Sequence, residues 1–311
     1  MKTLLAVFLT ALFISCGAEK EAVRYVGFRI YDPVYVALEL NLFEKHGVNV
    51  EIIDLIAGGP TALQAISGGS AEIALSSYMA IINASVQGLP IIAVSDIQSS
   101  IGTQPLEEFF VRSDSGIETI TDLAGKTVAI NLVKSSFHYT WLMALEAAGM
   151  AETDVEFVIL PFEQQELALI NHRVDAIGVL QPYTLRAREN PEIKTLFTAL
   201  DIFGERQFTT HVMNSNWAEK NPELAKGFVG AIAEAAAWIE ANQNEAREII
   251  SLHTGIPARD IENYYFQEHA AVIMADAQFW LDYMRSTGEV TAPHLTVNDF
   301  ATNRFNPFVE E

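Results

Sequence analysis

The alternation of short apolar runs with helical segments is the feature that most constrains how this chain can fold. Up to residue 94, segments that predict strands and segments that predict helices follow one another without exception. The predicted strands are residues 24–30, 48–54, 72–75 and 89–94, and the predicted helices between them are residues 34–41, 62–66 and 79–86. Strict alternation of this kind predicts a parallel sheet with helices packed on its faces.

A second α/β unit follows a break in this alternation. Residues 97–105 are polar and rich in turn-forming residues, and residues 109–112 then predict a strand with no helix before it. The alternation resumes with predicted strands at 127–130, 156–160, 174–179 and 193–197 and predicted helices at 137–148, 163–171 and 182–189. We therefore expect a second lobe with its own parallel sheet.

The last third of the chain is predicted to be mostly helical. Residues 208–213 predict a return strand, and residues 217–287 are largely helix, with the clearest helical period at 222–242. We expect two crossing segments between the lobes, near 108–112 and near 208–213. The C-terminal helices would then return to the first lobe.

Charge excludes some classes of partner. The chain has 40 acidic and 19 basic residues, which gives a net charge of −21. Binding to nucleic acid requires clustered Lys and Arg, so this composition argues against it. It argues equally against a basic face that binds anionic lipid. Half of the 311 residues are hydrophobic, which is enough for a substantial core in two lobes.

The N-terminus has the pattern of a targeting segment. Lys2 is followed by an apolar run over residues 4–14, interrupted only by Thr10, and this run is too short to span a bilayer comfortably. Ser15 and Cys16, the only cysteine, come directly after it and resemble a bacterial lipobox. We expect cleavage before Cys16 and thioether diacylation of its sulfur; the alternative is an ordinary secretory signal with an incidental cysteine. No cysteine then remains for a disulfide.

These patterns predict a division of the chain. We expect a signal peptide at residues 1–15, a lipidated tether at 16–22 and the first part of lobe 1 at 23–108. Hinge strands and lobe 2 would occupy residues 109–213, and helices of residues 214–311 would return to lobe 1.

Two serine pairs stand at matching positions of the two lobes. Ser76 and Ser77 follow the third predicted strand, and Ser135 and Ser136 stand where the helix after residue 130 begins. Ligands bind at the carboxyl ends of parallel strands, where hydroxyls and free backbone N–H groups are available. The alternative is that these serines only cap their helices.

Other residues of the loops that follow strands are candidate ligand contacts. Tyrosines there could stack on a planar ligand or pack against their own loops. Glycines could admit a ligand close to the backbone or serve turn geometry. The further candidates are Tyr31, Asp32, Tyr35, Gly58, Gly59, Pro60, Tyr78, Gln98, Lys134, His138, Gln181, Tyr183, Phe208 and His211.

Three charged or titratable candidates have opposite interpretations. Asp32 would repel anions and accept an amine or ring N–H, or it is an ordinary turn residue before a proline. Lys134 would neutralise an anionic ligand, or it lies in solvent. His138 would contact the ligand, or it orders the loop before its helix.

Five motifs in order resemble a large family of solute-binding proteins. They are residues 33–48 (PVYVALELNLFEKHGV), 58–60 (GGP), 65–74 (AISGGSAEIA), 122–129 (DLAGKTVA) and 174–176 (VDA). The family comprises the substrate-binding proteins of ABC importers for nitrate, taurine and alkanesulfonates, and thiamine-pyrimidine precursors, together with eukaryotic pyrimidine-synthesis enzymes. The resemblance implies a type II periplasmic-binding fold, α/β and two-lobed, whose mostly parallel sheets are flanked by helices and whose cleft closes on the ligand. It also implies an ABC permease and ATPase as partners.

The resemblance leaves the ligand open. Many members of this family have an acidic residue where this chain has Gln181, so the charge of the ligand is not implied. We favour a planar heteroaromatic ligand, such as a pyrimidine precursor or a flavin-like compound. An anion such as an alkanesulfonate, taurine or nitrate is the alternative.

The resemblance also bears on other functions. The enzymes of this family depend on a cysteine-rich iron-binding motif, and this chain has no cysteine after Cys16, so we expect no enzyme, no cofactor and no metal. A sensor that signals its closed state to a membrane kinase is a further alternative. We expect an exported, lipid-anchored monomer.

Overall fold

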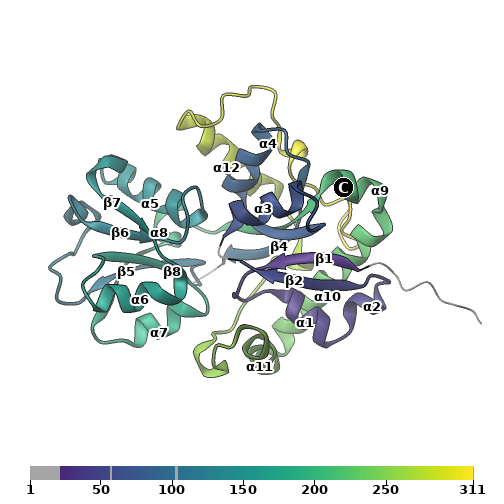
Figure 1. Cartoon of the computed structure of the whole chain (residues 1–311), viewed down its shortest axis with the longest axis horizontal. Coiled ribbons are helices and arrows are strands. Elements are labelled where there is room, and N and C mark those ends of the chain that lie inside the picture. Colours follow the sequence, from purple (N-terminus) through teal and green to yellow (C-terminus); the bar gives the residue numbers. More distant parts are fainter. Residues whose placement is uncertain (1–21, 57, 102–103, 311) are drawn as a thin grey trace, which may run out of the picture.

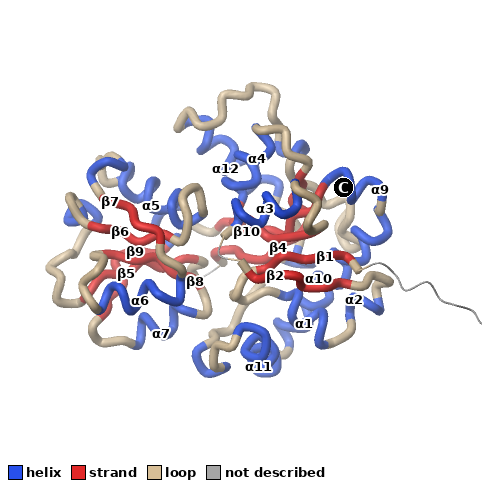
Figure 2. Tube along the Cα trace, viewed as in Figure 1, coloured by secondary structure: helices blue, strands red, loops and turns tan. Residues whose placement is uncertain are grey.

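The computed structural model describes residues 22–56, 58–101 and 104–310, and it consists of two α/β lobes (Figure 1). Each lobe contains one five-stranded sheet, with strand orders β2-β1-β3-β10-β4 and β7-β6-β8-β5-β9. Figure 2 shows both sheets enclosed by helices. The expected two-lobed α/β architecture is therefore present. In the part of the chain that is described, no helix combines the length and apolar character needed to cross a membrane.

The first sheet has a parallel half and an antiparallel half. Strand β1 (Val23–Gly27) lies between β2 (Val50–Leu55) and β3 (Ile73–Ser77) and pairs with both in parallel. Strand β10 (Arg206–Asn214) lies between β3 and β4 (Ile91–Ser100) and pairs with both in antiparallel register. A strand from late in the chain therefore joins the middle of the first sheet.

Helices cover both faces of the first sheet (Figure 1). Those on one face are α1 (Pro33–Glu39), α2 (Leu42–Lys45) and α10 (Pro222–Ala241). Those on the other face are α3 (Gly59–Ser67), α4 (Tyr78–Val86) and α12 (Met274–Ser286). Two further helices of this lobe are α9 (Ser215–Lys220) and α11 (Gln243–Thr254). The C-terminal helices thus return to the first lobe.

The second sheet is parallel along one edge. Its strands are β5 (Glu107–Arg112), β6 (Thr127–Ile130), β7 (Glu156–Ile159), β8 (Ala176–Leu180) and β9 (Ile193–Thr198). Strand β6 pairs in parallel with β7 and β8, whereas β5 is antiparallel to β8 and β9. Its helices are α5 (Ser136–Ala147), α6 (Phe162–Ile170), α7 (Tyr183–Glu189) and α8 (Ala199–Phe203). The chain crosses between the sheets twice, between β4 and β5 and between β9 and β10.

Strand β4 is longer than the sequence predicts. The prediction ends the strand at residue 94 and makes residues 97–105 a polar, turn-rich segment, but β4 continues to Ser100. The extension pairs with β10, where Arg206 faces Ser100 and Gln207 faces Ser99. Apolar periodicity misses such a strand, because its polar residues are buried by a partner that lies far away in sequence.

Two glycines of α10 allow this helix to lie close to α2 and the turn that follows it. A β-carbon on Gly227 would lie 2.6 Å from the backbone oxygen of His46, and one on Gly230 would lie 2.8 Å from the His46 ring nitrogen Nδ1. The contact at Gly227 is to backbone, which cannot rotate away. The packing of α10 on lobe 1 therefore depends on the missing side chain at this position.

We expect Gly227→Ala to destabilise the protein by about 1–3 kcal/mol, because the added methyl group must push α10 away from α2. Urea unfolding followed by circular dichroism would measure this loss. The control is Lys226→Ala, at an exposed position of the same helix. Equal stability of the two variants would contradict the proposed close packing.

Candidate functional site

A pocket between the two lobes brings together the ends of several strands. Its residues from lobe 1 are Phe28, Ile30, Gly59, Ser77 and Thr209, and those from lobe 2 are Asn131, Ser135, Ser136, Phe137, Phe162 and Leu180. A neighbouring pocket shares three of these residues and adds Arg29, Leu55, Ile56, Pro161, Glu163 and Tyr183. We call the two together the interlobe cleft. It lies where open α/β sheets bind their ligands, outside the carboxyl ends of parallel strands.

The two predicted glycines lie at close contacts around the cleft. A β-carbon on Gly58 would lie 3.2 Å from the side chain of Leu132 in lobe 2. A β-carbon on Gly59 would lie 2.3 Å from the hydroxyl of Ser76 in its own lobe. Gly58 therefore marks a place where the lobes meet, and Gly59 lets the start of α3 pack on the end of β3.

The serine pair of lobe 2 both caps a helix and lines the cleft. The Ser135 hydroxyl accepts a hydrogen bond from the backbone N–H of His138 at 3.4 Å and donates one to Asn131 Oδ1 at 2.7 Å. Ser136 is the first residue of α5, and both serines line the cleft. The two interpretations of the sequence, capping and ligand contact, are therefore compatible at Ser135.

In the serine pair of lobe 1, one residue lines the cleft and the other is buried. Ser77 precedes α4, makes no side-chain capping hydrogen bond and lines the cleft. Ser76 is fully buried, and its hydroxyl has no hydrogen-bond partner among the described residues. Of this pair, Ser77 is the one that faces the cleft, opposite Ser135 and Ser136.

Asp32 belongs to a buried network inside lobe 1. Its carboxylate accepts hydrogen bonds from the backbone N–H of Val34, which caps α1, and from the hydroxyl of Tyr25. Nε2 of His211 lies 3.3 Å from the same carboxylate, and Nδ1 of His211 lies 2.9 Å from the hydroxyl of Ser95. Asp32 and His211 are both fully buried, so they stabilise the lobe and do not line the cleft.

Three of the four candidate tyrosines are also buried in lobe 1. Tyr31 stacks on Tyr264 at a ring-centre distance of 4.9 Å, and Tyr78 donates a hydrogen bond to Gln207 at 2.6 Å. Tyr35 donates one to the backbone oxygen of Phe28 at 2.7 Å and so holds a cleft residue in place. Burial raises the pKa of each of these three hydroxyls, which keeps them neutral.

Tyr183 is the candidate tyrosine that lines the cleft. It stacks on Phe162, and Phe162 in turn packs edge-on against Phe137. Burial raises the pKa of Tyr183, and the nearby Glu163 raises it further, whereas the guanidinium of Arg29 opposes the rise. Lobe 2 thus presents an aromatic wall, and two charged residues line the same pocket, Glu163 from lobe 2 and Arg29 from lobe 1.

Lys134 and His138 contact residues outside the cleft. The Lys134 ammonium group lies 3.5 Å from the carboxylate of Glu289, and the His138 ring lies 3.4 Å from that of Glu152. Burial lowers the pKa of His138, and Glu152 opposes that shift. The cation at the mouth of the cleft is instead Arg29, which sequence reasoning placed within a strand.

The remaining candidates lie elsewhere. Gln181 is buried, with its amide 3.5 Å from the backbone oxygen of Asn263, and it lines a different pocket, to which lobe 2 and the C-terminal segment of lobe 1 both contribute. Phe208 packs against Phe203 and Trp280 in the core, and Pro60 lines a pocket on α3 and α4. Gln98 is on β4, but its side chain lies outside what the structure describes, as does Cys16.

Several cleft residues were not predicted from the sequence. They are Phe28, Arg29, Ile30, Leu55, Ile56, Asn131, Phe137, Pro161, Phe162, Glu163, Leu180 and Thr209. Position offered a signal for some of them, because Asn131 directly follows β6 and Phe162 is the first residue of α6. No local pattern distinguishes Thr209, whose strand joins the first sheet from far along the chain.

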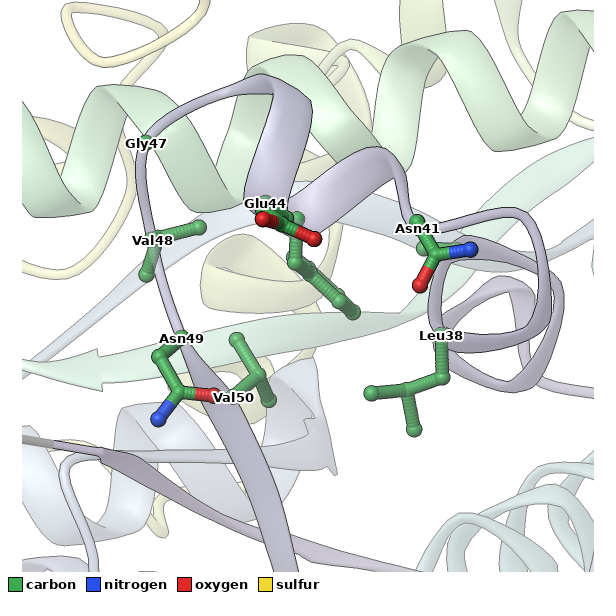
Figure 3. Close-up of a pocket in the computed structure, with 9 residues that line it drawn as sticks. Leu38, Asn41, Glu44, Gly47, Val48, Asn49 and Val50 are labelled. Carbon is green, nitrogen blue, oxygen red and sulfur yellow. The ribbon is translucent and has the colours of Figure 1, made fainter.

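A further pocket lies on the outside of lobe 1 (Figure 3). Its walls are formed by α1, α2 and the start of β2, and it includes Leu38, Asn41, Glu44, Asn49 and Val50. All of these residues belong to one lobe, so lobe closure would not reshape this pocket. Within the described residues, no group of three His, Cys, Asp or Glu side chains could hold a metal ion.

We expect Asp32→Ala to lower the free energy of unfolding by about 2–4 kcal/mol, because the change removes a helix cap and leaves buried polar groups of Tyr25 and His211 unpaired. Chemical denaturation measures this loss. Asp114→Ala, at an exposed site, is the matched control. A stable Asp32→Ala protein with impaired ligand binding would instead place Asp32 in the ligand site.

Comparison with solved structures supports the architecture. The periplasmic aliphatic sulphonate binding protein SsuA from Escherichia coli matches with a TM-score of 0.72 at 23% identity, covering 90% of this chain and 91% of SsuA. The periplasmic nitrate-binding protein NrtA from Synechocystis PCC 6803 matches with a TM-score of 0.73 at 18% identity, covering 92% of this chain and 87% of NrtA. These likenesses confirm the expected periplasmic-binding fold.

Sequence comparison identifies relatives with different ligands. The riboflavin-binding protein RibY of Chloroflexus aurantiacus is 26% identical over 313 residues, which cover 92% of this chain and 85% of RibY. The taurine-binding periplasmic protein of Escherichia coli is 24% identical over 297 residues, which cover 88% of this chain and 89% of that protein. The family described as NMT1/THI5 like matches residues 31–246. This match spans more than half of the sequence, and the chain therefore belongs to the NMT1/THI5-like family.

Proposed function

We propose that this protein captures a planar heteroaromatic molecule in the interlobe cleft and delivers it to an ABC importer. The observation that carries the proposal is the aromatic wall of Phe137, Phe162 and Tyr183, with Phe28 of lobe 1 lining the same cleft. Phe28, Phe162 and Tyr183 are only half-buried. They therefore retain ring surface that a flat ligand can cover.

Polar groups around this wall suit a ring that carries both donors and acceptors. The hydroxyls of Ser77 and Thr209 come from lobe 1, and those of Ser135 and Ser136 from lobe 2. Few polar groups among apolar and aromatic side chains are typical of sites for small organic molecules. Contacts from both lobes at once would favour the state in which the lobes are together.

The relatives support a role in transport, but the ligands in their names differ. Those compared above are named as binding proteins, which favours capture over catalysis. A riboflavin-binding relative fits a flat heteroaromatic ligand. An anion such as taurine or an alkanesulfonate is the second candidate, and Arg29 at the mouth of the cleft is the observation that favours it. An ABC permease and its ATPase would be the partners of a monomeric binding protein.

We expect riboflavin or an aminopyrimidine to raise the melting temperature of the purified mature protein, and taurine, alkanesulfonates and nitrate to have little effect. A ligand at a hundred times its Kd stabilises a protein by about 2.7 kcal/mol, which a thermal-shift assay detects. Stabilisation by the anions alone would overturn the heteroaromatic assignment in favour of the second candidate.

A substitution in the aromatic wall tests whether the ligand binds in the interlobe cleft. Phe162→Ala should weaken binding of the stabilising ring compound at least about tenfold, because it removes a stacking face. The control Leu167→Ala lies on the exposed side of the same helix, α6. Equal affinities of the two variants, measured by calorimetry, would place the ligand elsewhere.

We further propose that the exported protein is anchored through lipid on Cys16. The apolar run and the residue order around Cys16 motivate this proposal. In a bacterial host, Cys16→Ala should abolish incorporation of labelled palmitate and move the protein from the membrane fraction to the soluble fraction. Ser15→Gly, which keeps a small residue before the cysteine, should retain both. A Cys16→Ala protein that still incorporates label would overturn the anchor.

A further inference from the structure

A buried carboxyl group lies directly behind the cleft serines of lobe 2. Glu107 is the first residue of β5 and is 1% exposed. The hydroxyl of Thr140 donates a hydrogen bond to its carboxylate at 2.7 Å, and the side chain of Ser136 acts on the same carboxylate by lowering its pKa. In the sheet, Glu107 pairs with Leu180, which itself lines the cleft. Glu107 is therefore adjacent to two residues that line the cleft, Ser136 and Leu180, but it does not line the cleft itself.

Helix geometry explains this arrangement. Ser136 and Thr140 are four residues apart on α5, so their side chains lie on the same face of the helix. Both hydroxyls meet Glu107, while the N-terminal end of the helix meets the cleft. An ionised carboxylate can only accept hydrogen bonds. Ser136 then donates its proton inward, and its oxygen lone pairs are left for a donor on the ligand.

The charge on Glu107 also acts on what can bind at the start of α5. A helix N-terminus attracts anions through its free N–H groups and its dipole. A buried carboxylate behind it opposes that attraction, because like charges at short range in a poorly solvated site repel strongly. The anion site that the start of α5 would otherwise provide is thereby weakened.

Among the described residues, the groups that stabilise a charge on Glu107 are hydroxyls and not cations. Burial raises its pKa to about 7, and the hydrogen bonds from Ser136 and Thr140 oppose the rise. Its neighbour Glu108 points to the opposite face of β5, where Arg188 lies 3.4 Å away and Glu262 also contributes. On β8, the residue paired with Glu107 is Leu180, which carries no charge. On α5, the groups described next to Glu107 are the hydroxyls of Ser136 and Thr140.

We propose that Glu107 is a positioning residue that sets ligand specificity: by orienting Ser136 and placing negative charge behind α5, it selects a neutral group with an N–H donor and excludes anions. This inference rests on the interlobe cleft being the binding site of the proposed function. When Glu107 is protonated its charge disappears, so the exclusion of anions is expected to weaken as the pH falls.

The test compares Glu107→Gln with the wild-type protein, using methanesulfonate and nitrate as anionic probes and riboflavin as a neutral planar probe. Gln keeps the size of the side chain and its carbonyl acceptor but carries no charge. At pH 8 most wild-type molecules carry the charge, so Glu107→Gln should bind the anions about tenfold more tightly than wild type. At pH 6 the two proteins should bind them nearly equally.

The pH profile distinguishes this role from a merely structural one. Wild-type affinity for the anions should fall as the pH rises from 6 to 8, whereas that of Glu107→Gln should stay level. Thr140→Val removes a hydrogen bond that favours the ionised form, so it should shift the midpoint of the fall to higher pH. Affinity for riboflavin should not improve in Glu107→Gln.

Three outcomes would overturn the proposal. They are anion affinities that are equal in wild type and Glu107→Gln at pH 8, anions that bind neither protein at millimolar concentration, and a midpoint that Thr140→Val leaves in place. Calorimetry measures all of them, and a melting curve at each pH checks that each variant is folded. Failure of riboflavin and pyrimidines to bind the wild type would instead count against the proposed function, and the anion comparison would still decide the role of Glu107.

Discussion

The pairing of β10 with β3 and β4 is the constraint on which most of this structure depends. Strand β10 lies between β3 and β4 in the first sheet, although it follows all five strands of the second sheet in the sequence. The same strand brings His211 to Asp32, Gln207 to Tyr78 and Thr209 to the interlobe cleft. One antiparallel insertion therefore connects the core of lobe 1, the second crossing between the lobes and a wall of the site.

Strands and helices whose signal is local could be predicted from the sequence. The strand at residues 127–130 coincides with β6, and α5 differs from its prediction by one residue at each end. These elements have apolar periodicity, a capping serine before the helix and a glycine after it. The polar end of β4 could not be predicted, because its pairing with the distant strand β10 stabilises it. The short helix α8 was missed although its signal is local, since Thr198 and Asp201 form a capping box at its start and Gly204 ends it.

The candidate site was predicted in outline, by position, and less well by residue type. Ser77, Ser135, Ser136, Gly59 and Tyr183 line the cleft, as their places after strands suggest. Asp32 and Tyr35 also follow a strand, yet their side chains turn into lobe 1 and find partners there. Whether a loop side chain points toward the ligand or into the core depends on packing with distant residues such as His211, which a single sequence does not specify.

The hydrogen bond from Tyr35 to the backbone of Phe28 has a consequence for how the cleft can change. It connects the lobe 1 wall to a helix that is itself capped by Asp32, so a shift of the backbone at Phe28 requires α1 to move with it or this hydrogen bond to break. In the aromatic wall of lobe 2, Phe137 is buried in the core, whereas Phe162 and Tyr183 are half-buried first residues of α6 and α7. Substitution of these two rings would therefore remove less core packing than substitution of Phe137. New ligand preferences would thus arise most readily by substitution in lobe 2, while lobe 1 acts as a constant template.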